Sequence, residues 1–420
     1  MKPVSEPSPV ASGRRDLRVL LPRDFCLYLL ARFCTGTAMT MLRAAILWHV
    51  FAISHSAFHL GLIGLVQFLP ALVLSLVGGA VADSHDRRRV MMAAEALALA
   101  CALVLFVATR AGTVSLLLLY GMVFLVAIAG AFDNPARAAL LPALVAREVF
   151  PQAVAIGSTN QALAFATGPA LCGLVIARAG IASVYALYVG LVGVSLATLL
   201  FMRSRPLLGS GRVVSLQAIR EGLRFVRRHQ VILGCMTLDM FAVIFGGASA
   251  LLPIYANDIL KVGASGYGLL TSSLEIGALL ASLAMIALPP ISRAGRALLI
   301  GVAGYGLATI VFGLSRSFPL SVIAYVIVGI GDQVSVVMRA TAIQLSTPDD
   351  LRGRVSSVNM IFIGASNQLG AAESGFVAAL TNATFSVVSG GVGCLIVMAI
   401  VAATLPQLRR YRIEFRTSAA

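Results

Sequence analysis

The chain has 420 residues, of which 59% are hydrophobic and only 12% are charged. Soluble domains carry about twice that charged fraction, so the composition excludes an ordinary soluble protein. The net charge of +15 would suit a nucleic-acid partner, but the basic residues lie in short segments between apolar runs. Anionic lipid and membrane topology account for them there. We therefore predict an all-α membrane protein whose surroundings are the lipid bilayer, with no nucleic-acid partner.

Twelve apolar runs are long enough to cross a hydrocarbon layer of ~30 Å as helices. Two polar tails flank them, 1–23 and 406–420, and a polar linker, 203–229, separates an N-terminal six-helix bundle, 24–202, from a C-terminal one, 230–405. The first tail lacks the order of a signal peptide, so the first span is expected to stay uncleaved. The spans are expected at 24–53, 57–82, 90–109, 113–134, 152–177, 180–202, 230–256, 265–288, 294–314, 318–339, 356–380 and 383–405.

The distribution of basic residues predicts the topology. Of 32 Lys and Arg residues, 26 lie on the side of the two tails, 4 lie on the opposite side, and 2 lie within the first span. Segments rich in Lys and Arg stay in the cytoplasm. Both termini are therefore expected to be cytoplasmic.

A short basic turn joins the second and third spans. Gly79 would let the helix ends approach closely, and Asp83, at the end of a helix, is placed to meet an arginine of a neighbouring segment. Arg87 and Arg88, which open a run of three arginines, would take part in such contacts as a gate. The alternative is that the arginines are only a topology signal.

A weak internal repeat relates the two halves. Asp133 and Arg137 lie at the end of the fourth span, and Asp332 and Arg339 lie at the end of the tenth, about 200 residues further on. Two parallel halves of six helices, with a binding site between them near the midplane, are typical of transporters. We expect these four residues to make ion pairs that break and form as the halves rock.

Two stretches predict local features of the backbone. In the linker, Leu223 and Val226 continue an apolar helical spacing that begins at Leu216, with arginines on the other faces. This pattern indicates an amphipathic helix, either a surface brace between the bundles or a helix that binds a partner. In the seventh span, Gly246-Gly247 and Pro253 predict a break that neighbouring side chains must satisfy.

The sequence offers no chemistry of an enzyme. The six cysteines and five histidines show no spacing of metal ligands, and no glycine-rich nucleotide loop is present. No nucleophile–base set is recognisable either. We therefore expect neither catalysis nor a bound metal or cofactor.

The pattern Gly79-x-x-x-Asp83 with basic residues after it, the twelve spans and the central linker resemble the major facilitator superfamily over essentially the whole chain. The fuller pattern of that superfamily has a basic residue and a Gly where this chain has Ser84 and Asp86. This departure weakens a charge relay at the turn and leaves the fold unaffected. The resemblance implies a major facilitator fold with two six-helix bundles.

Three stretches narrow the resemblance. Residues 31–33, 82–90 and 344–355 resemble the branch of bacterial enterobactin exporters and macrolide-efflux permeases. The resemblance implies a monomer of the bacterial inner membrane that exports a small molecule, usually with protons as the driving ion. The substrate would be a siderophore or a similar bulky molecule, and multidrug or macrolide efflux is the alternative. A sensor or scaffold that does not transport is disfavoured, because buried carboxylates are costly and a passive scaffold has no use for them.

In this superfamily spans one, four, seven and ten line the substrate cavity. Arg32 and Arg43 share a face of the first span, and Asp239 lies in the seventh span at nearly the place of Arg32. The two arginines would hold an anionic or catechol-type oxygen, or Arg32 would pair with Asp239 across the halves. Alternatively, Arg43 snorkels at the outer interface and Asp239 forms a static pair. Gln67 and Gln333 would add hydrogen bonds.

Carboxylates within spans are candidates for proton coupling, because a low dielectric favours their neutral form. Asp239, Glu275 and Glu373 are the candidates, and hydrogen bonds that hold helices together are the competing explanation. Glu95 is also a carboxylate within a span, the third, but the sequence does not indicate what it faces in the fold.

Overall fold

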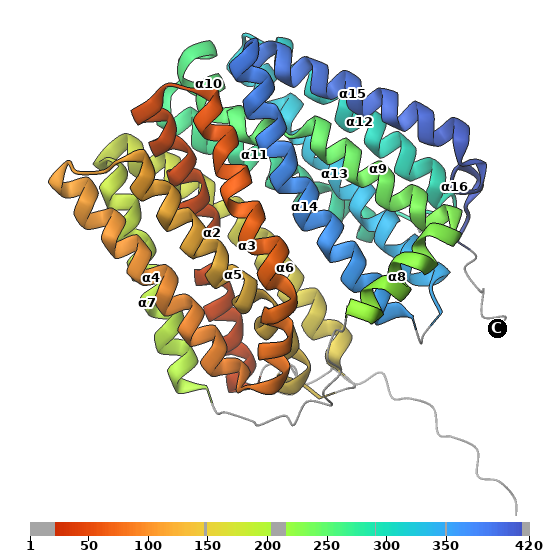
Figure 1. Ribbon diagram of the computed structural model, residues 1–420, viewed down its shortest axis with the longest axis horizontal. Coiled ribbons are helices and arrows are strands. Elements are labelled where there is room, and N and C mark those ends of the chain that lie inside the picture. Colours follow the sequence, from red (N-terminus) through yellow and green to blue (C-terminus); the bar gives the residue numbers. More distant parts are fainter. Residues whose placement is uncertain (1–21, 147–148, 203–215, 290, 349–350, 414–420) are drawn as a thin grey trace, which may run out of the picture.

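A computed structural model describes residues 22–146, 149–202, 216–289, 291–348 and 351–413 (Figure 1). This part of the chain is built from helices and contains no β-strand. At some positions within the helices, Asp83 among them, the side chain lies outside the described structure. The fold follows from the apolar runs of the sequence, because a helix satisfies every backbone polar group within a single segment.

The first half of the chain forms a bundle of six long helices, in which α2 packs against α6 and α7, and α5 packs against α3 and α4 (Figure 1). Side-chain caps set several of their ends: Asp86 accepts a hydrogen bond from the backbone N–H of Arg88 at 3.0 Å and starts α4. Gly112 ends α4 with a φ of 68°. The helices are α2 (Arg23–Ser54), α3 (Ala57–Ser84), α4 (Arg87–Ala111), α5 (Leu116–Leu144), α6 (Phe150–Ala179) and α7 (Ile181–Phe201).

The second half repeats this plan, in which α13 packs against α11 and α12, and α15 packs against α9 and α12. Its long helices are α9 (Gln230–Gly246), α11 (Gly263–Ala287), α12 (Ala294–Leu314), α13 (Phe318–Ser346), α14 (Arg352–Leu380) and α15 (Ala383–Thr404). The short α16 (Pro406–Arg410) follows them.

The predicted break in the seventh span is confirmed. Helix α9 ends at Gly246, and the chain continues through a 3-10 turn η2 (Ala248–Leu251), one α turn α10 (Leu252–Ile254) and a π turn η3 (Tyr255–Ile259). The hydroxyl of Tyr305 on α12 donates to the carbonyl of Gly246 at 2.9 Å. A neighbouring helix thus satisfies a backbone group that the break sets free.

Ten helical segments of the described chain are long and apolar enough to cross a bilayer. They correspond to ten of the twelve predicted spans. The other two predicted spans are the helices α3 and α14, which have 28 and 29 residues and pack against each other. The lengths of these two helices lie within the range of the ten segments that could cross a bilayer. That the chain crosses the membrane twelve times remains a prediction.

The linker helix α8 (Leu216–Arg228) lies across one end of the second half, which we call the α8 end (Figure 1). Gly222 packs against the backbone of Arg354 on α14, Glu221 pairs with Arg354 at 2.8 Å, and Val226 is buried. The main contacts of this helix are with α9 and α14 of the second half, and a brace between the two bundles stays a prediction. Residues 203–215 of the linker lie outside the described structure.

The hydrophobic cores show where the two halves meet. One core cluster joins both halves and contains Met41 and Ala45 of α2 together with Tyr267 and Leu270 of α11. Two further clusters each belong to a single half, one around Phe25 and Met91, the other around Met236 and Met338. The shared core lies at the end opposite α8, which we call the α10 end, and α3 and α14 diverge from there toward the α8 end (Figure 1).

Glycines allow the close contact at the α10 end. A Cβ on Gly173 of α6 would lie 2.5 Å from the carbonyl oxygen of Ala264 on α11, and one on Gly61 of α3 would lie 3.0 Å from Gly375 of α14. Such distances leave no room for a side chain, so the backbones of the two halves touch directly.

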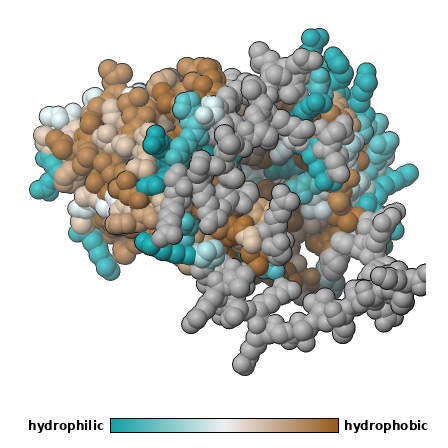
Figure 2. Space-filling model, turned by 90° about the horizontal axis from the view of Figure 1, so that it is seen from below, coloured by the Kyte–Doolittle hydropathy of each residue, from teal (hydrophilic) through white to brown (hydrophobic). Residues whose placement is uncertain are grey.

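The opposite face of the molecule is the one seen from the α8 end. Hydrophilic residues lie on the described part of that face, and hydrophobic areas lie beside them (Figure 2).

We expect Gly173→Val to separate the halves at the α10 end, because the added side chain would meet the backbone of α11. Spin labels at Thr113 and Thr381, both exposed in loops at this end, would report a longer distance by electron paramagnetic resonance in a chain without its native cysteines. Gly193→Val is the matched control, because nothing lies within 4 Å of a Cβ there. Equal distances in both variants would contradict this account of the contact.

Candidate functional site

A buried charge cluster lies inside the first half. Arg137 donates to both carboxylate oxygens of Asp133, one turn earlier on α5, at 3.0 Å each. The same guanidinium donates to Glu95 Oε1 of α4 at 2.7 Å. The three residues are at most 9% exposed. One arginine thus binds two carboxylates in a region from which water is largely excluded.

Hydroxyl groups extend this cluster to two more helices. Thr35 on α2 donates to Glu95 Oε1 at 2.9 Å, and Ser195 on α7 contacts the same oxygen at 3.0 Å. Glu95 therefore connects α2, α4, α5 and α7, all within the first half. The sequence showed Glu95 only as an unplaced carboxylate, and its single signal was a charge within an apolar helix.

Arg32 lies next to this cluster and faces α6. Its guanidinium donates to the hydroxyl of Tyr28 at 2.7 Å and to the side-chain oxygen of Gln161. Tyr28 in turn donates to the backbone carbonyl of Arg137 at 3.4 Å. Nothing in the sequence singled out Tyr28 or Gln161.

In the second half, Asp239 of α9 forms a buried ion pair with Arg339 of α13. This pair differs from two expectations. Arg32 and Asp239 do not meet across the halves in this structure, because each has a partner in its own half. The repeat is also asymmetric: Arg137 binds its neighbour Asp133, whereas Arg339 binds Asp239 and not Asp332.

Three of the predicted residues form a chain of electrostatic neighbours that links the two halves. Arg43 of α2 is within electrostatic range of Glu275 on α11, and Glu275 is within range of Asp332 on α13. Arg43 is exposed although it lies in the interior of a 32-residue helix. Because its electrostatic partner belongs to the other half, that exposed side chain lies between the two bundles and is accessible there. We call Arg43, Glu275 and Asp332 the interface triad.

The remaining candidates are spread over the molecule. Gln67, Gln333 and Glu373 are half-buried, and Ser374 donates to Glu373 at 3.4 Å. A Cβ on Gly79 would meet nothing within 4 Å, so close helix contact at this glycine is not observed among the described residues.

The basic turn contributes one defined contact. Arg88 donates to the backbone carbonyls of Met202 and Leu200 at 2.8 and 2.7 Å. A cation is favourable at the carbonyl end of a helix, so Arg88 ties the start of α4 to the end of α7. Arg87 is half-buried beside it. The side chain of Asp83, the other member of the predicted gate, lies outside the described structure.

The described residues contain no group of three or more His, Cys, Asp or Glu side chains that would hold a metal ion. The six cysteines form no disulfide bond, and five of them are buried.

Comparison with known proteins identifies the family. The sequence profile of the transmembrane secretion effector family matches residues 23–416. The chain belongs to this family, which is part of the major facilitator superfamily. It is a transporter and not an enzyme.

Curated relatives agree with this assignment. The chain is 27% identical over 383 residues to the enterobactin exporter EntS of Escherichia coli O81 (strain ED1a), which covers 91% of this chain and 92% of that protein. It is 26% identical over the same length to the enterobactin exporter EntS of Escherichia fergusonii.

Solved structures show the fold. The nucleoside transporter NupG superposes with a TM-score of 0.72 at 11% identity, over 91% of this chain and 99% of that one. A POT family transporter in complex with 5-aminolevulinic acid also reaches 0.72 at 13% identity, over 92% and 97% of the two chains. A bacterial homologue of the lysosomal transporter Spinster, in an inward-facing and unoccupied conformation, reaches 0.68 at 14% identity, over 94% and 97%.

We expect Asp239→Leu to lower the stability of the purified protein by about 3 kcal/mol, because it leaves the buried cation of Arg339 unpaired. Arg339→Met in the same chain should recover most of this loss, since an apolar pair can replace a buried ion pair. Thermal unfolding in detergent measures both variants. A double variant as unstable as the single one would contradict the pairing.

Proposed function

We propose that this protein is a proton-coupled exporter of a bulky anionic small molecule of the siderophore type. It would work by alternating access in the inner membrane of a bacterium, as a monomer with twelve spans. The observation that carries this proposal is the position of Arg43. An arginine that is exposed between two helical bundles, and that has a carboxylate of the opposite bundle, Glu275, within electrostatic range, suits the binding of an anion.

The distribution of positive charge supports the orientation. The helices that border both tails, the linker and the basic turn reach the α8 end, and these segments of the sequence hold most of the 32 basic residues of the chain. Since such segments stay in the cytoplasm, the α8 end is the cytoplasmic one. The halves touch at the opposite end, so this conformation would receive its substrate from the cytoplasm, as an exporter must.

The relatives support the substrate class. The curated relatives are enterobactin exporters, and they match over more than nine-tenths of this chain. A siderophore offers oxygen groups that carry or share negative charge, and a guanidinium binds such groups through paired hydrogen bonds. Arg43 would therefore be the main contact of the substrate, with Gln67 and Gln333 as further donors.

The interface triad suggests how protons are coupled. When an anionic substrate binds Arg43, Glu275 loses its countercharge while Asp332 stays within electrostatic range of it, and a proton that binds one of these two carboxylates replaces that charge. Release of the substrate on the far side returns Arg43 to the carboxylates and expels the proton. Asp239 and Glu373 are the alternative carriers. Asp239 is ion-paired, so its use would require that the pair with Arg339 opens during the cycle.

A strain that lacks the gene tests the function directly. Under iron starvation, mass spectrometry would compare siderophore in the cytoplasm and in the medium. We expect retention inside the deletion strain and release after complementation. Equal distributions would contradict siderophore export and favour macrolide or multidrug efflux. A panel of macrolides and dyes, with and without a proton uncoupler, would then test that alternative.

We expect Arg43→Gln to abolish export in the complemented strain, because the substrate loses its countercharge, while Arg43→Lys retains part of it. Arg110→Gln is the matched control, since Arg110 is an exposed residue at the end of α4. The amount of each variant in the membrane would be measured alongside export. Full activity of Arg43→Gln would remove Arg43 from the binding site.

A further inference from the structure

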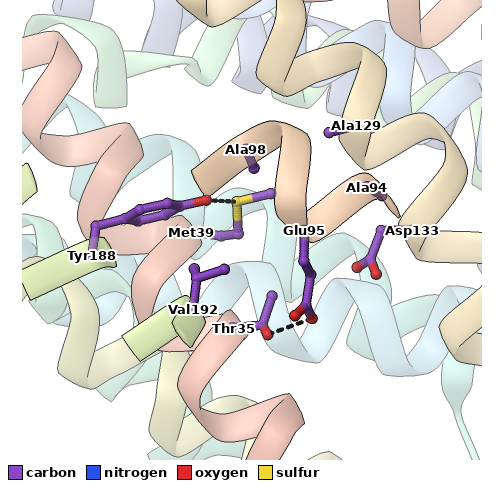
Figure 3. A pocket seen from close by; sticks show the side chains of 9 residues that line it. All are labelled: Thr35, Met39, Ala94, Glu95, Ala98, Ala129, Asp133, Tyr188 and Val192. Atoms are coloured by element: carbon purple, nitrogen blue, oxygen red, sulfur yellow. Dashed lines mark hydrogen bonds between the residues drawn. The ribbon is translucent and has the colours of Figure 1, made fainter. Parts of the chain in front are cut away.

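A small cavity lies inside the first half, enclosed by α2, α4, α5 and α7 (Figure 3). At one of its ends the carboxylates of Glu95 and Asp133 lie close to Thr35, and at the other Tyr188 contacts the sulfur of Met39. The remaining walls are apolar: Ala94, Ala98, Ala129 and Val192. This cavity is separate from the interface triad, and the sequence predicted no role for it.

The hydrogen bonds of Glu95 are unevenly divided. Its Oε1 atom is contacted by Arg137, Thr35 and Ser195 at 2.7, 2.9 and 3.0 Å. Its Oε2 atom is buried and has no hydrogen-bond partner among the residues that the structure describes. The residue is only 4% exposed. A buried carboxylate oxygen without a donor is strongly unfavourable when it carries negative charge.

The charges around Glu95 do not balance at short range. Asp133 and Arg137 form a two-point pair in which one anion neutralises one cation. Glu95 is then a second anion on the same guanidinium. Of the other helices packed here, α2 contributes Arg32, whose hydrogen bonds go to Tyr28 and Gln161. The contacts of Glu95 with α7 involve the neutral Ser195.

We propose that Glu95 is a proton-binding site of the first half, occupied in the conformation described here. The proton binds Oε2, converting the carboxylate to a neutral carboxylic acid with an O–H bond beside the cavity. The Oε1 atom then acts as a carbonyl oxygen and keeps its three contacts. In the reverse step the O–H bond breaks, the proton leaves, and the carboxylate regains its negative charge.

A proton on Glu95 would change the electrostatic interactions among four helices. Arg137 on α5, Thr35 on α2 and Ser195 on α7 all contact the same oxygen of Glu95 on α4. Loss of the proton strengthens the attraction between Glu95 and Arg137, and so competes with the pair of Arg137 and Asp133. The assignment of this site to proton coupling rests on the proposed function, but its protonation does not.

Infrared spectroscopy of the purified protein tests the proposal without any substrate. A protonated carboxyl group has a C=O stretching band that is distinct from the bands of a carboxylate and shifts in deuterium oxide. We expect Glu95→Gln to remove such a band at neutral pH, because glutamine keeps the shape and the carbonyl oxygen but cannot hold the proton. Asp258→Asn is the matched control, since that carboxyl group is exposed in the π turn η3 and belongs to none of the proposed sites.

An unchanged carboxylic acid band in Glu95→Gln would overturn the proposal. If that variant does not fold, as judged by size-exclusion chromatography, Ser195→Ala provides a second route. It removes one hydrogen bond from Oε1 and leaves the carboxyl group in place, so the band should shift in frequency. A band that stays in place would again contradict a proton on Glu95.

Proteoliposomes that contain a pH-sensitive dye separate this proposal from the proposed function. With enterobactin as the probe, wild-type protein should move protons, and Glu95→Gln should not. A wild-type protein that moves none would count against the siderophore as substrate, and the infrared result would still decide the state of Glu95. A Glu95→Gln variant that moves protons as the wild type does would overturn the coupling role.

Discussion

The structure depends on one constraint: a charge inside a membrane protein must have a partner there, because lipid supplies none. Each half meets this constraint with a buried arginine, and the two arginines differ in their carboxylate partners. Arg137 binds two carboxylates of its own half, whereas Arg339 binds one. These pairs hold the helices of each half together as a unit, which is what a mechanism with two rocking bundles requires.

The charges that remain lie where the halves meet. Arg43, Glu275 and Asp332 belong to both bundles, so their interaction changes whenever the bundles move relative to each other. A close contact of glycines at the α10 end, such as Gly173 on Gly268, keeps that end shut. The two features are complementary, since small residues let the backbones touch and the interface triad leaves an accessible cation between the halves.

Glu95 adds a second kind of site. Its carboxyl group is held by residues of three other helices of the same half, and one of its oxygens lacks a hydrogen-bond partner in the described part of the chain. The interface triad and Glu95 would both bind and release protons of the same gradient, but under different structural control. The triad responds to the approach of the halves, and Glu95 responds to the packing within the first half.

The hydropathy of the sequence by itself determined the helical class, and most helix starts were predicted within a few residues. The ends were less accurate: the span predicted at 113–134 continues as α5 to Leu144, because Arg137 is neutralised by Asp133 and Glu95 and the helix extends past the apolar run. The sequence also singled out the ionisable residues within spans, because any such residue is conspicuous in an apolar helix. The family resemblance was confirmed by comparison with known proteins.

Only the tertiary structure decided which of these residues are partners. A pair of Asp239 with Arg32 was one of the alternatives that the sequence left open, and Asp239 binds Arg339 instead. Glu95 had no expected place but contacts three other helices. The physical reason is that a shift of one residue turns a side chain by about 100° around a helix. Partner choice therefore depends on how each helix is rotated and which helices adjoin it. Apolar periodicity is weak in spans that are hydrophobic on all sides, so it does not reveal that rotation.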